Sequence, residues 1–431
     1  MLDIKFIREN ADAIQQVALA KGLNVSVTEL LEVDATRLTL LRQIETLRHR
    51  RKTHSAQIEQ LLQAKQQAEA NRHKAQVRQI NEELARLEAQ FAKTVQRYTE
   101  LMLLIPNIIS PDTPFGASDA DNVEIMRVGE PTVFAFPAKD HVTLAENLGM
   151  LDFPRGVKVA GTRGYFLKNA GLYLHRAVQQ LALDVLYARG FTAMDVPLLV
   201  RETAMENTGG FPTGRDQTYH LPMDQKWLVG TSEVPLVSYH ANEIVDIEEP
   251  IRLAAISNCF RREAGSAGRD VHGLYRVHQF AKVEQVVLCK NDLDTSLQLF
   301  EEITKNAQDI LAMLELPYRM VAVCTGDLSQ KNYKQYDIET WMPSRNSYGE
   351  THSSSILLDF QTRRTNIRYR DKDGALQFCH SLNNTAVATP RILIPLLENH
   401  QRPDGSIYMP KALRKYMNGL EELKMPLVHN L

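Results

Sequence analysis

Apolar residues recur at heptad spacing in two stretches between Leu40 and Leu101, and residues 37–100 contain no glycine or proline. In the second stretch they fill both seam positions except at Thr94: Val77, Ile80, Leu84, Leu87, Phe91, Tyr98 and Leu101. In the first stretch the seam is interrupted at Arg51 and His54: Leu40, Ile44, Leu47, Ile58 and Leu61. Helices with this repeat pack along a narrow seam. Because polar residues 63–73 separate the stretches, we predict an antiparallel coiled-coil hairpin over about 37–104 that projects from the body.

The later part of the chain shows a mixture of helical and strand periods. A long helical pattern covers about 169–189, and strand-like runs cover 251–260 and 276–284, with a polar, glycine-bearing loop between the two runs. Alternation places charged and aromatic side chains on one face of the second run: Arg276, His278, Phe280, Lys282 and Glu284. Val277, Ala281 and Val283 fall on the other face. The polar face suits a planar, anionic ligand, and the alternative is a solvated, salt-bridged strand face.

The boundary between the two patterns lies near Pro106, which interrupts the second helix. Residues 110–122 are rich in Ser, Pro, Asp and Gly, which is typical of a linker. We therefore expect an N-terminal domain at 1–109, a linker at 110–122 and a second domain at 123–431. The fold class is α+β.

Composition and charge narrow the function classes. The chain has 431 residues, 44% of them hydrophobic, and its four cysteines form no CxxC pair, which argues against a disulfide framework or a thiolate zinc cluster. The start has no signal-peptide character and the run at 101–109 is too short to span a bilayer, so we expect a cytoplasmic protein without membrane association. Residues 37–100 carry 13 Lys and Arg against 7 Asp and Glu, within a chain of net charge −2. A basic hairpin favours a polyanionic partner, although a dimerisation coiled coil is the alternative.

Several ordered segments resemble the motifs of class II aminoacyl-tRNA synthetases. Phe260-Arg261, Glu263 and Arg276-x-His278-x-Phe280 resemble motif 2, residues 190–197 resemble motif 1, and residues 383–399 resemble motif 3. Four segments are similar to the seryl-tRNA synthetase family in particular: 231–236, Asn383-Asn384-Thr385, Glu350-x-x-Ser353 and 410–419. The resemblance covers the whole chain.

This resemblance implies an N-terminal tRNA-binding domain followed by a class II catalytic domain, a mostly antiparallel sheet flanked by helices. The implied enzyme is an AMP-forming serine--tRNA ligase. It activates L-serine with ATP as seryl-adenylate and transfers it to the 3′ end of tRNA(Ser), with tRNA(Sec) as a further candidate acceptor. ATP is a substrate, Mg²⁺ the cofactor, a homodimer the expected assembly, and no DNA partner is expected.

The resemblance also assigns residues. Arg261, Glu350 and Arg391 are the expected catalytic residues, with Arg276 toward the distal phosphates and Phe280 under the adenine. The expected ATP-binding set is Arg261, Arg262, Glu263, Arg276, Val277, Phe280, Glu350, Thr351, His352, Ser353 and Arg391. The expected serine-binding set is Thr231, Ser232, Glu233, Arg261, Glu284, Asn383 and Thr385.

Two of these assignments carry a structural requirement. Glu350 and Ser353, the expected Mg²⁺ ligands, are three apart and would face opposite sides of a regular strand, so a bulge or turn is required near Thr351 and His352. Thr389 followed by Pro390 resembles a helix start, so Arg391 would open a helix with its N-terminus toward phosphate.

The basic residues Arg48, Arg50, Arg51 and Lys52 of the hairpin, and Arg269 of the loop, are candidate tRNA contacts, which would give affinity rather than sequence readout. Two alternatives remain: a synthetase-like paralogue that loads an amino acid onto a carrier protein, and a non-catalytic tRNA-binding paralogue. The long basic hairpin counts against the first, and the intact set of Arg261, Arg276, Glu350 and Arg391 counts against the second.

Overall fold

The computed structural model describes residues 1–265 and 273–424. The chain divides into two compact units, one formed by Asp3–Leu19 and Leu23–Ile105, and the other by Met1–Leu2, Ala20–Gly22 and the chain from Pro106 onward. Arg269 lies outside the described residues. Among the described residues, none of the helices combines the length and apolar character needed to cross a membrane.

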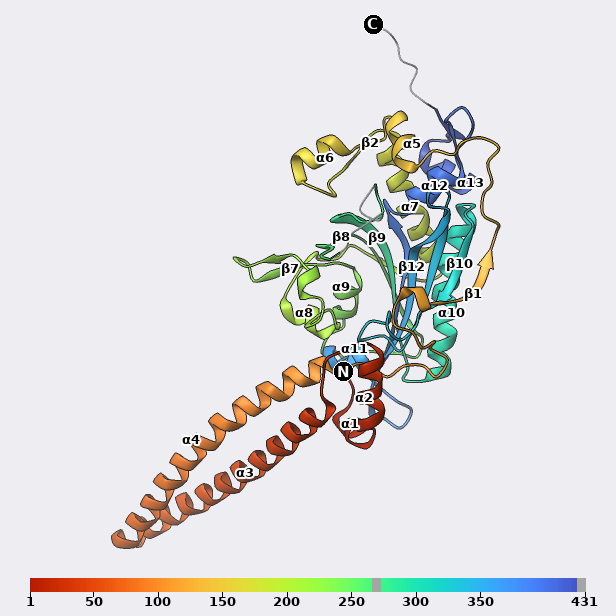
Figure 1. The fold of residues 1–431 in the computed structure, drawn as a ribbon. Coiled ribbons are helices and arrows are strands. Elements are labelled where there is room, and N and C mark those ends of the chain that lie inside the picture. Colours follow the sequence, from red (N-terminus) through yellow and green to blue (C-terminus); the bar gives the residue numbers. More distant parts are fainter. Residues whose placement is uncertain (266–272, 425–431) are drawn as a thin grey trace. The chain divides into compact units, whose positions relative to one another are not determined.

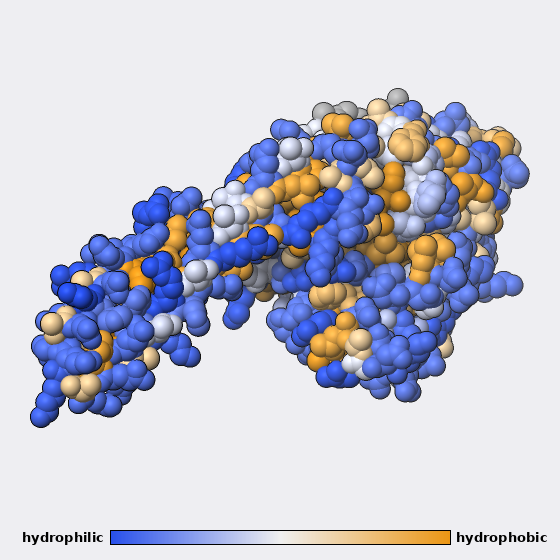
Figure 2. Space-filling view, turned by 90° about the horizontal axis from the view of Figure 1, so that it is seen from below, coloured by the Kyte–Doolittle hydropathy of each residue, from blue (hydrophilic) through white to orange (hydrophobic). Residues whose placement is uncertain are grey.

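The first unit contains two short helices, α1 (Ile4–Glu9) and α2 (Ala11–Ala20), and two long ones, α3 (Val27–Gln63) and α4 (Gln67–Leu104). The seam residues of α3 and α4 bury one another, which confirms the antiparallel coiled coil: Leu40, Ile44, Leu47, Ile80, Leu84 and Leu87, with Phe91 beside them. On the face shown in Figure 2 the surface of this hairpin is mostly hydrophilic. Because the apolar seam is narrow, the pairing of α3 with α4 is enough to bury it.

Both ends of α3 differ from the heptad pattern. The helix begins at Val27 because the Ser26 side chain accepts from the Glu29 amide and caps it. The turn to α4 occupies only residues 64–66, since the polar residues from Gln67 onward are good helix formers. The sequence pattern Ser-x-x-Glu is typical of a helix start, and it indicates this beginning of α3. The heptad pattern of the seam does not indicate it.

The second unit is built on an eight-stranded sheet in the order β1-β10-β11-β12-β15-β9-β8-β4 (Figure 1). Its neighbouring strands pair antiparallel except β4 with β8, which confirms the mostly antiparallel sheet. The strands are β1 (Val123–Val128), β4 (Thr192–Met194), β8 (Ile251–Phe260), β9 (Gln279–Cys289), β10 (Tyr318–Ala322), β11 (Lys334–Met342), β12 (Ser347–Leu358) and β15 (His380–Thr389).

Helices cover both faces of this sheet. The long helices α7 (Ala170–Ala188) and α10 (Leu293–Met313) pack with the main apolar core, and α9 (Glu233–Ser238) packs with a second core on the opposite face. The smaller elements are α5 (His141–Asn147), β2 (Leu151–Asp152), α6 (Phe153–Ala160), β3 (Phe166–Leu167), β5 (Leu199–Val200), α8 (Glu202–Asn207), β6 (His220–Leu221), β7 (Lys226–Leu228), α11 (Phe360–Thr365), β13 (Arg368–Arg370), β14 (Leu376–Phe378), α12 (Leu393–Asn399), β16 (Ile407–Tyr408), α13 (Lys411–Arg414) and β17 (Glu422–Leu423).

Strand β9 is central and buried on both faces. Val283 and Val287 point into the main core, and Val286 and Leu288 into the second core. The buried charged residues Lys282 and Glu284 lie on the same face as Val286 and Leu288, and they precede these two core residues along the strand. The alternative of a solvated strand face is therefore wrong, because the main core packs on one face of β9 and the second core packs on the other.

Candidate active site

A cavity of about 360 Å³ opens on the sheet between β8, β9, β12 and β15. It gathers thirteen of the predicted site residues: Thr231, Glu233, Arg261, Glu263, Val277, Phe280, Glu284, Glu350, Thr351, Ser353, Asn383, Thr385 and Arg391. Four others do not line it: Ser232, Arg262, Arg276 and His352. Strand pairing brings residues far apart in sequence onto one wall, as the register Glu284 with Thr385 illustrates.

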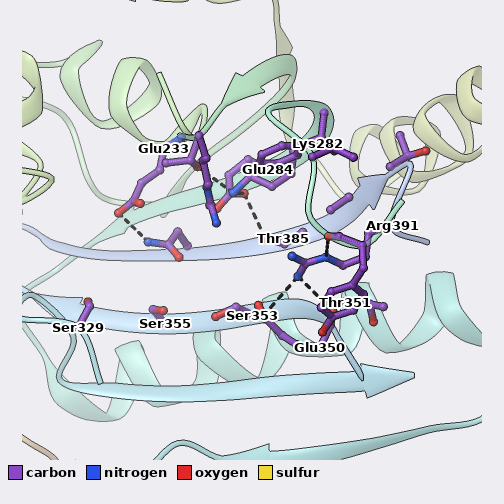
Figure 3. A pocket seen from close by; sticks show the side chains of 18 of the residues that line it. Glu233, Lys282, Glu284, Ser329, Glu350, Thr351, Ser353, Ser355, Thr385 and Arg391 are labelled. Atoms are coloured by element: carbon purple, nitrogen blue, oxygen red, sulfur yellow. Dashed lines mark hydrogen bonds and ion pairs between the residues drawn. The ribbon is translucent and has the colours of Figure 1, made fainter. Parts of the chain in front are cut away.

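The antiparallel strands give this cavity a direction. Along β15, Thr389 pairs with Ala281 and Asn383 pairs with Ser355 of β12, so Thr389 and Asn383 mark opposite ends. Strand residues advance about 3.3 Å each, which separates Glu350 from Ser355 by roughly 15 Å. Figure 3 shows Arg391 and Glu350 at one end, Glu284 and Thr385 in the middle, and Glu233, Ser329 and Ser355 at the other. We call these the arginine end, the middle and the closed end.

At the arginine end, the guanidinium of Arg391 is fixed by Tyr275 and Glu350. Its Nε donates to the Tyr275 carbonyl at 3.1 Å, and its Nη1 donates to the Glu350 carbonyl at 3.2 Å and lies 3.4 Å from the Glu350 Oε2. The expected helix start at Thr389 is wrong, because α12 begins at Leu393 and the Thr389 hydroxyl lies 3.0 Å from the His175 Nδ1 instead. Arg391 thus sits in the turn before the helix.

The bulge required between Glu350 and Ser353 is present. Ile338 of β11 pairs with His352 and Glu339 pairs with Glu350, which leaves Thr351 as the extra residue. Glu350 and Ser353 consequently both face the cavity. His352 turns into the interior, where its Nδ1 lies 2.8 Å from the Thr351 hydroxyl and burial lowers its pKa to about 3. A buried, neutral imidazole is a structural part of the strand.

Asp337 is an acidic neighbour that sequence reasoning missed. It pairs with Ser353 across β11 and β12. Burial raises the pKa of its carboxyl well above the ordinary value, and the nearby Glu350 charge adds to the effect. In the sequence, Asp337 is an aspartate within a strand-like run and belongs to no motif, so it could not be singled out.

This donor set fits a hard cation. Glu350 and Ser353 would supply oxygen ligands. A cation nearby would also offset the Glu350 charge that helps to raise the pKa of Asp337. Among the described residues, groups of three or more His, Cys, Asp or Glu with metal-binding geometry are absent. Mg²⁺ commonly takes one or two carboxylates and completes its shell with water and phosphate, so the small set is compatible with it.

Arg261 follows the last residue of β8 and lies toward the arginine end, because Phe260 pairs with Gln279 and the nearby Ala281 pairs with Thr389. Its Nε donates to the Gly230 carbonyl at 3.3 Å, and its guanidinium carbon is 5.3 Å from the centre of the Phe280 ring. Arg276 is outside the cavity lining, where its Nη1 contacts the Glu263 carboxylate at 3.1 Å. An aromatic plate beside a guanidinium suits a base and its attached phosphate.

The middle of the cavity contains a buried ion pair between Lys282 and Glu284. The Lys282 Nζ also donates to the Thr231 hydroxyl at 2.8 Å, and the Thr385 hydroxyl lies 3.4 Å from the Glu284 Oε2. Burial raises the pKa of the Glu284 carboxyl, although the Lys282 charge opposes this. An incoming ammonium group would find an acceptor and a hydroxyl side by side.

The closed end is formed around Glu233, at the start of α9. Lys331, which lies in a loop without any motif, donates to both of its carboxylate oxygens at 2.6 Å. Gln361 and Asn383 donate to the same carboxylate at 2.7 Å and 2.8 Å. Burial opposes ionisation here, but Lys331 and Gln361 outweigh it, and the pKa of Glu233 lies below its ordinary value.

Comparison with known proteins identifies relatives over the full length. Residues 1–109 match the seryl-tRNA synthetase N-terminal domain, and residues 220–400 match the tRNA synthetase class II core domain (G, H, P, S and T). A serine--tRNA ligase from Deinococcus radiodurans is 43% identical over 99% of this chain and 100% of the relative.

Two solved structures have the same fold. The seryl-tRNA synthetase from Pyrococcus horikoshii complexed with ATP superposes with a TM-score of 0.90 at 36% identity, covering 99% of this chain and 100% of that chain. The cytoplasmic serine-tRNA ligase from Naegleria fowleri in complex with AMP gives 0.85 at 27% identity, covering 99% of each.

Proposed function

The chain belongs to the seryl-tRNA synthetase family, and from this premise we propose that it activates L-serine with ATP and transfers the seryl group to the 3′ end of serine tRNAs. The observation that carries the proposal is the order of groups in the cavity. Arginines and an aromatic ring stand at one end, and a carboxylate with a hydroxyl stands in the middle. An aminoacyl-adenylate presents its groups in the same order, with the base and phosphate at one end and the amino acid at the other. Loading of a carrier protein and a purely RNA-binding role are not favoured by relatives named as serine--tRNA ligases.

In the first step, the serine carboxylate attacks the α-phosphate of ATP and pyrophosphate leaves. Arg261 and Arg391 would neutralise charge that develops on the phosphate, and Phe280 would support the adenine ring. Little covalent participation by the protein is needed, because phosphoryl transfer depends on positioning and charge. Mg²⁺ held by Glu350 and Ser353 would supply further charge neutralisation at the phosphates.

Serine itself would bind in the middle of the cavity. Its ammonium would pair with Glu284 and its hydroxyl would lie near Thr385. An ammonium ligand favours the ionised carboxylate, which offsets the raised pKa of Glu284. A site that hydrogen-bonds the substrate hydroxyl rejects alanine because its polar groups would be left unpaired.

The second step transfers the seryl group from the adenylate to the terminal ribose of tRNA. The hairpin of α3 and α4 would hold the tRNA through phosphate contacts from Arg48, Arg50, Arg51 and Lys52. All four side chains are exposed on α3, although Arg48 contacts Glu88 at 2.8 Å. The selenocysteine tRNA is a further candidate acceptor.

A homodimer is part of the proposal. The helix α7 exposes large apolar side chains to solvent, with Leu172, Tyr173 and Tyr187 at 46%, 58% and 72% exposure. Motif 1 includes the segment that follows this helix, and a two-fold mate would cover such an apolar surface.

Amino-acid-dependent exchange of labelled pyrophosphate into ATP tests the activity. Each of the twenty amino acids is supplied in turn, and serine is expected to give the highest rate. Charging of a serine tRNA transcript with labelled serine then tests the second step. Exchange with another amino acid in preference to serine would overturn the proposal.

A further inference from the structure

Lys331 occupies a defined place at the closed end of the cavity. It lies in the segment between β10 and β11, its side chain is 19% exposed, and its ammonium bridges both oxygens of the 7% exposed Glu233 carboxylate. The Glu233 Oε1 also accepts from Gln361 and Asn383. A carboxylate has about four acceptor positions, so these donors use its capacity. Glu233 therefore holds Lys331 in place and has little left to offer a substrate ammonium.

The aliphatic part of Lys331 is also confined. A Cβ placed on Gly209 would lie 3.3 Å from both the Cβ and the Cδ of Lys331, so the stem passes directly over this glycine. The backbone of Gly209 has φ +81°, a conformation that side chains rarely adopt. The stem against Gly209 and the ammonium on Glu233 hold the side chain at both ends.

The loop that carries Lys331 is held from beneath. The buried Lys21 ammonium donates to the carbonyls of Ser329, Gln330 and Asn332 at 3.2, 3.3 and 2.7 Å. Asn107 donates through its amide nitrogen to the Lys331 carbonyl at 3.0 Å. The end wall is consequently anchored through both its side chain and its backbone.

The position of Lys331 at the closed end, away from the arginine end, suggests its role. Figure 3 shows Arg391 at the arginine end, Glu284 in the middle and Glu233 at the closed end. If phosphate binds at the arginine end and Glu284 accepts the ammonium, the side chain of a bound amino acid would point toward the closed end. We propose that Lys331 is a specificity-determining residue, which closes this end and limits the substrate to a side chain as short as that of serine. This inference deepens the proposed function and rests on it.

Homoserine is the sharpest probe, because it lengthens the serine side chain by one methylene toward the wall. Threonine adds its methyl group at Cβ and serves as a lateral control. The measured quantity is the ratio of kcat/KM for serine to that for each analogue in pyrophosphate exchange. A pocket that excludes one methylene discriminates about 10- to 200-fold.

Lys331→Ala is expected to lower the serine-to-homoserine ratio at least tenfold and to leave the serine-to-threonine ratio within about threefold. Lys331→Met keeps the length of the stem without the charge, and is expected to retain most of the homoserine discrimination. Lys331→Ser provides a second truncated variant if Lys331→Ala does not fold, as judged by circular dichroism.

An unchanged homoserine ratio in the folded truncated variant would overturn the proposal. An equal loss of homoserine discrimination in Lys331→Met and Lys331→Ala would also overturn the proposal, since the ion pair and not the stem would then be responsible. An equal gain in activity toward homoserine and threonine would overturn it as well. Failure of the proposed function is seen separately, as a wild-type enzyme that does not respond to serine.

Discussion

The guanidinium carbon of Arg391 lies 4.4 Å from the centre of the Tyr275 ring, and the Arg391 Nε donates to the Tyr275 backbone carbonyl. The guanidinium of Arg345 lies 3.9 Å from the same ring centre. Tyr275 therefore orients Arg391 through both its ring and its backbone, before any nucleotide is bound. Preorganised charge of this kind costs no reorganisation when the transition state forms.

Arg391→Ala and Glu350→Ala are expected to lower serine-dependent pyrophosphate exchange by about 10²- to 10³-fold, because in the proposed mechanism both side chains act on charge that changes in the transition state. Circular dichroism should show an unchanged fold. Arg402→Ala is the matched control, since Arg402 also lies over a tyrosine, with its guanidinium 5.8 Å from the Tyr408 ring, but does not line the cavity. Exchange near the wild-type rate in either cavity variant would mean that the site is misassigned.

Tyr275→Leu removes the ring from Arg391 and keeps the backbone carbonyl. A partly desolvated cation–π contact is worth about 0.5–2 kcal/mol, so the exchange rate should fall between about 2- and 30-fold. Tyr275→Phe retains the ring and should stay within about twofold of wild type. A loss as large in Tyr275→Phe as in Tyr275→Leu would assign the effect to the hydroxyl.

His352 should make the protein sensitive to acid. Its pKa is about 3 in the folded chain, against an ordinary value of 6.5. Between these pH values the unfolded chain binds the additional proton, so stability is present above pH 6.5 and is lost as the pH falls toward 3. The free energy of unfolding should fall by about 2 kcal/mol from pH 7 to pH 5 on account of this group.

His352→Gln should remove that share of the pH dependence, measured by urea unfolding at pH 7 and pH 5. The exposed His49, changed to Gln in the same way, is the control and should leave the pH dependence as in wild type. If His352→Gln retains the full acid sensitivity, the loss of stability belongs to other groups.

Sequence patterns predicted those features that depend on neighbours in the chain. The heptads gave the α3–α4 seam, and the spacing of Glu350 and Ser353 gave the bulge at Thr351. Features that depend on distant segments were not predictable. Burial of β9 on both faces needs the two cores that distant helices and strands complete, and the place of Lys331 is fixed by Glu233 and Gly209. The hydrophobic periodicity of a single segment does not indicate contacts with segments far away in the sequence.

Shortening the hairpin should separate the two steps of the reaction. Arg48 and Glu88 face each other across α3 and α4, so a short linker can replace the residues between them. Exchange of pyrophosphate should stay within about threefold of wild type, because the cavity residues lie outside the hairpin. Charging of tRNA should fall at least tenfold, and the salt dependence of tRNA binding should become shallower. Charging at full efficiency would show that the hairpin is a scaffold.

The exposed residues of α7 allow a test of assembly. Wild-type protein should scatter light as a dimer at micromolar concentration, and the double variant Leu172→Asp with Tyr173→Asp should be monomeric, because buried unpaired carboxylates oppose association. Leu19→Asp, at another exposed leucine, should remain dimeric. A stable, active wild-type monomer would contradict the proposal.

Lys21 bears on how members of this family can be recombined. Residues 20–22 belong to the compact unit that contains the cavity, and Lys21 supports the loop of Ser329 to Asn332. A chimaera joined at the linker after residue 109 would exchange this lysine together with the hairpin, and so would replace a support of the closed end of the cavity. Junctions within α3 and α4 would exchange only the segment proposed to bind RNA. For engineering purposes, the interchangeable module is thus the hairpin rather than the whole N-terminal region.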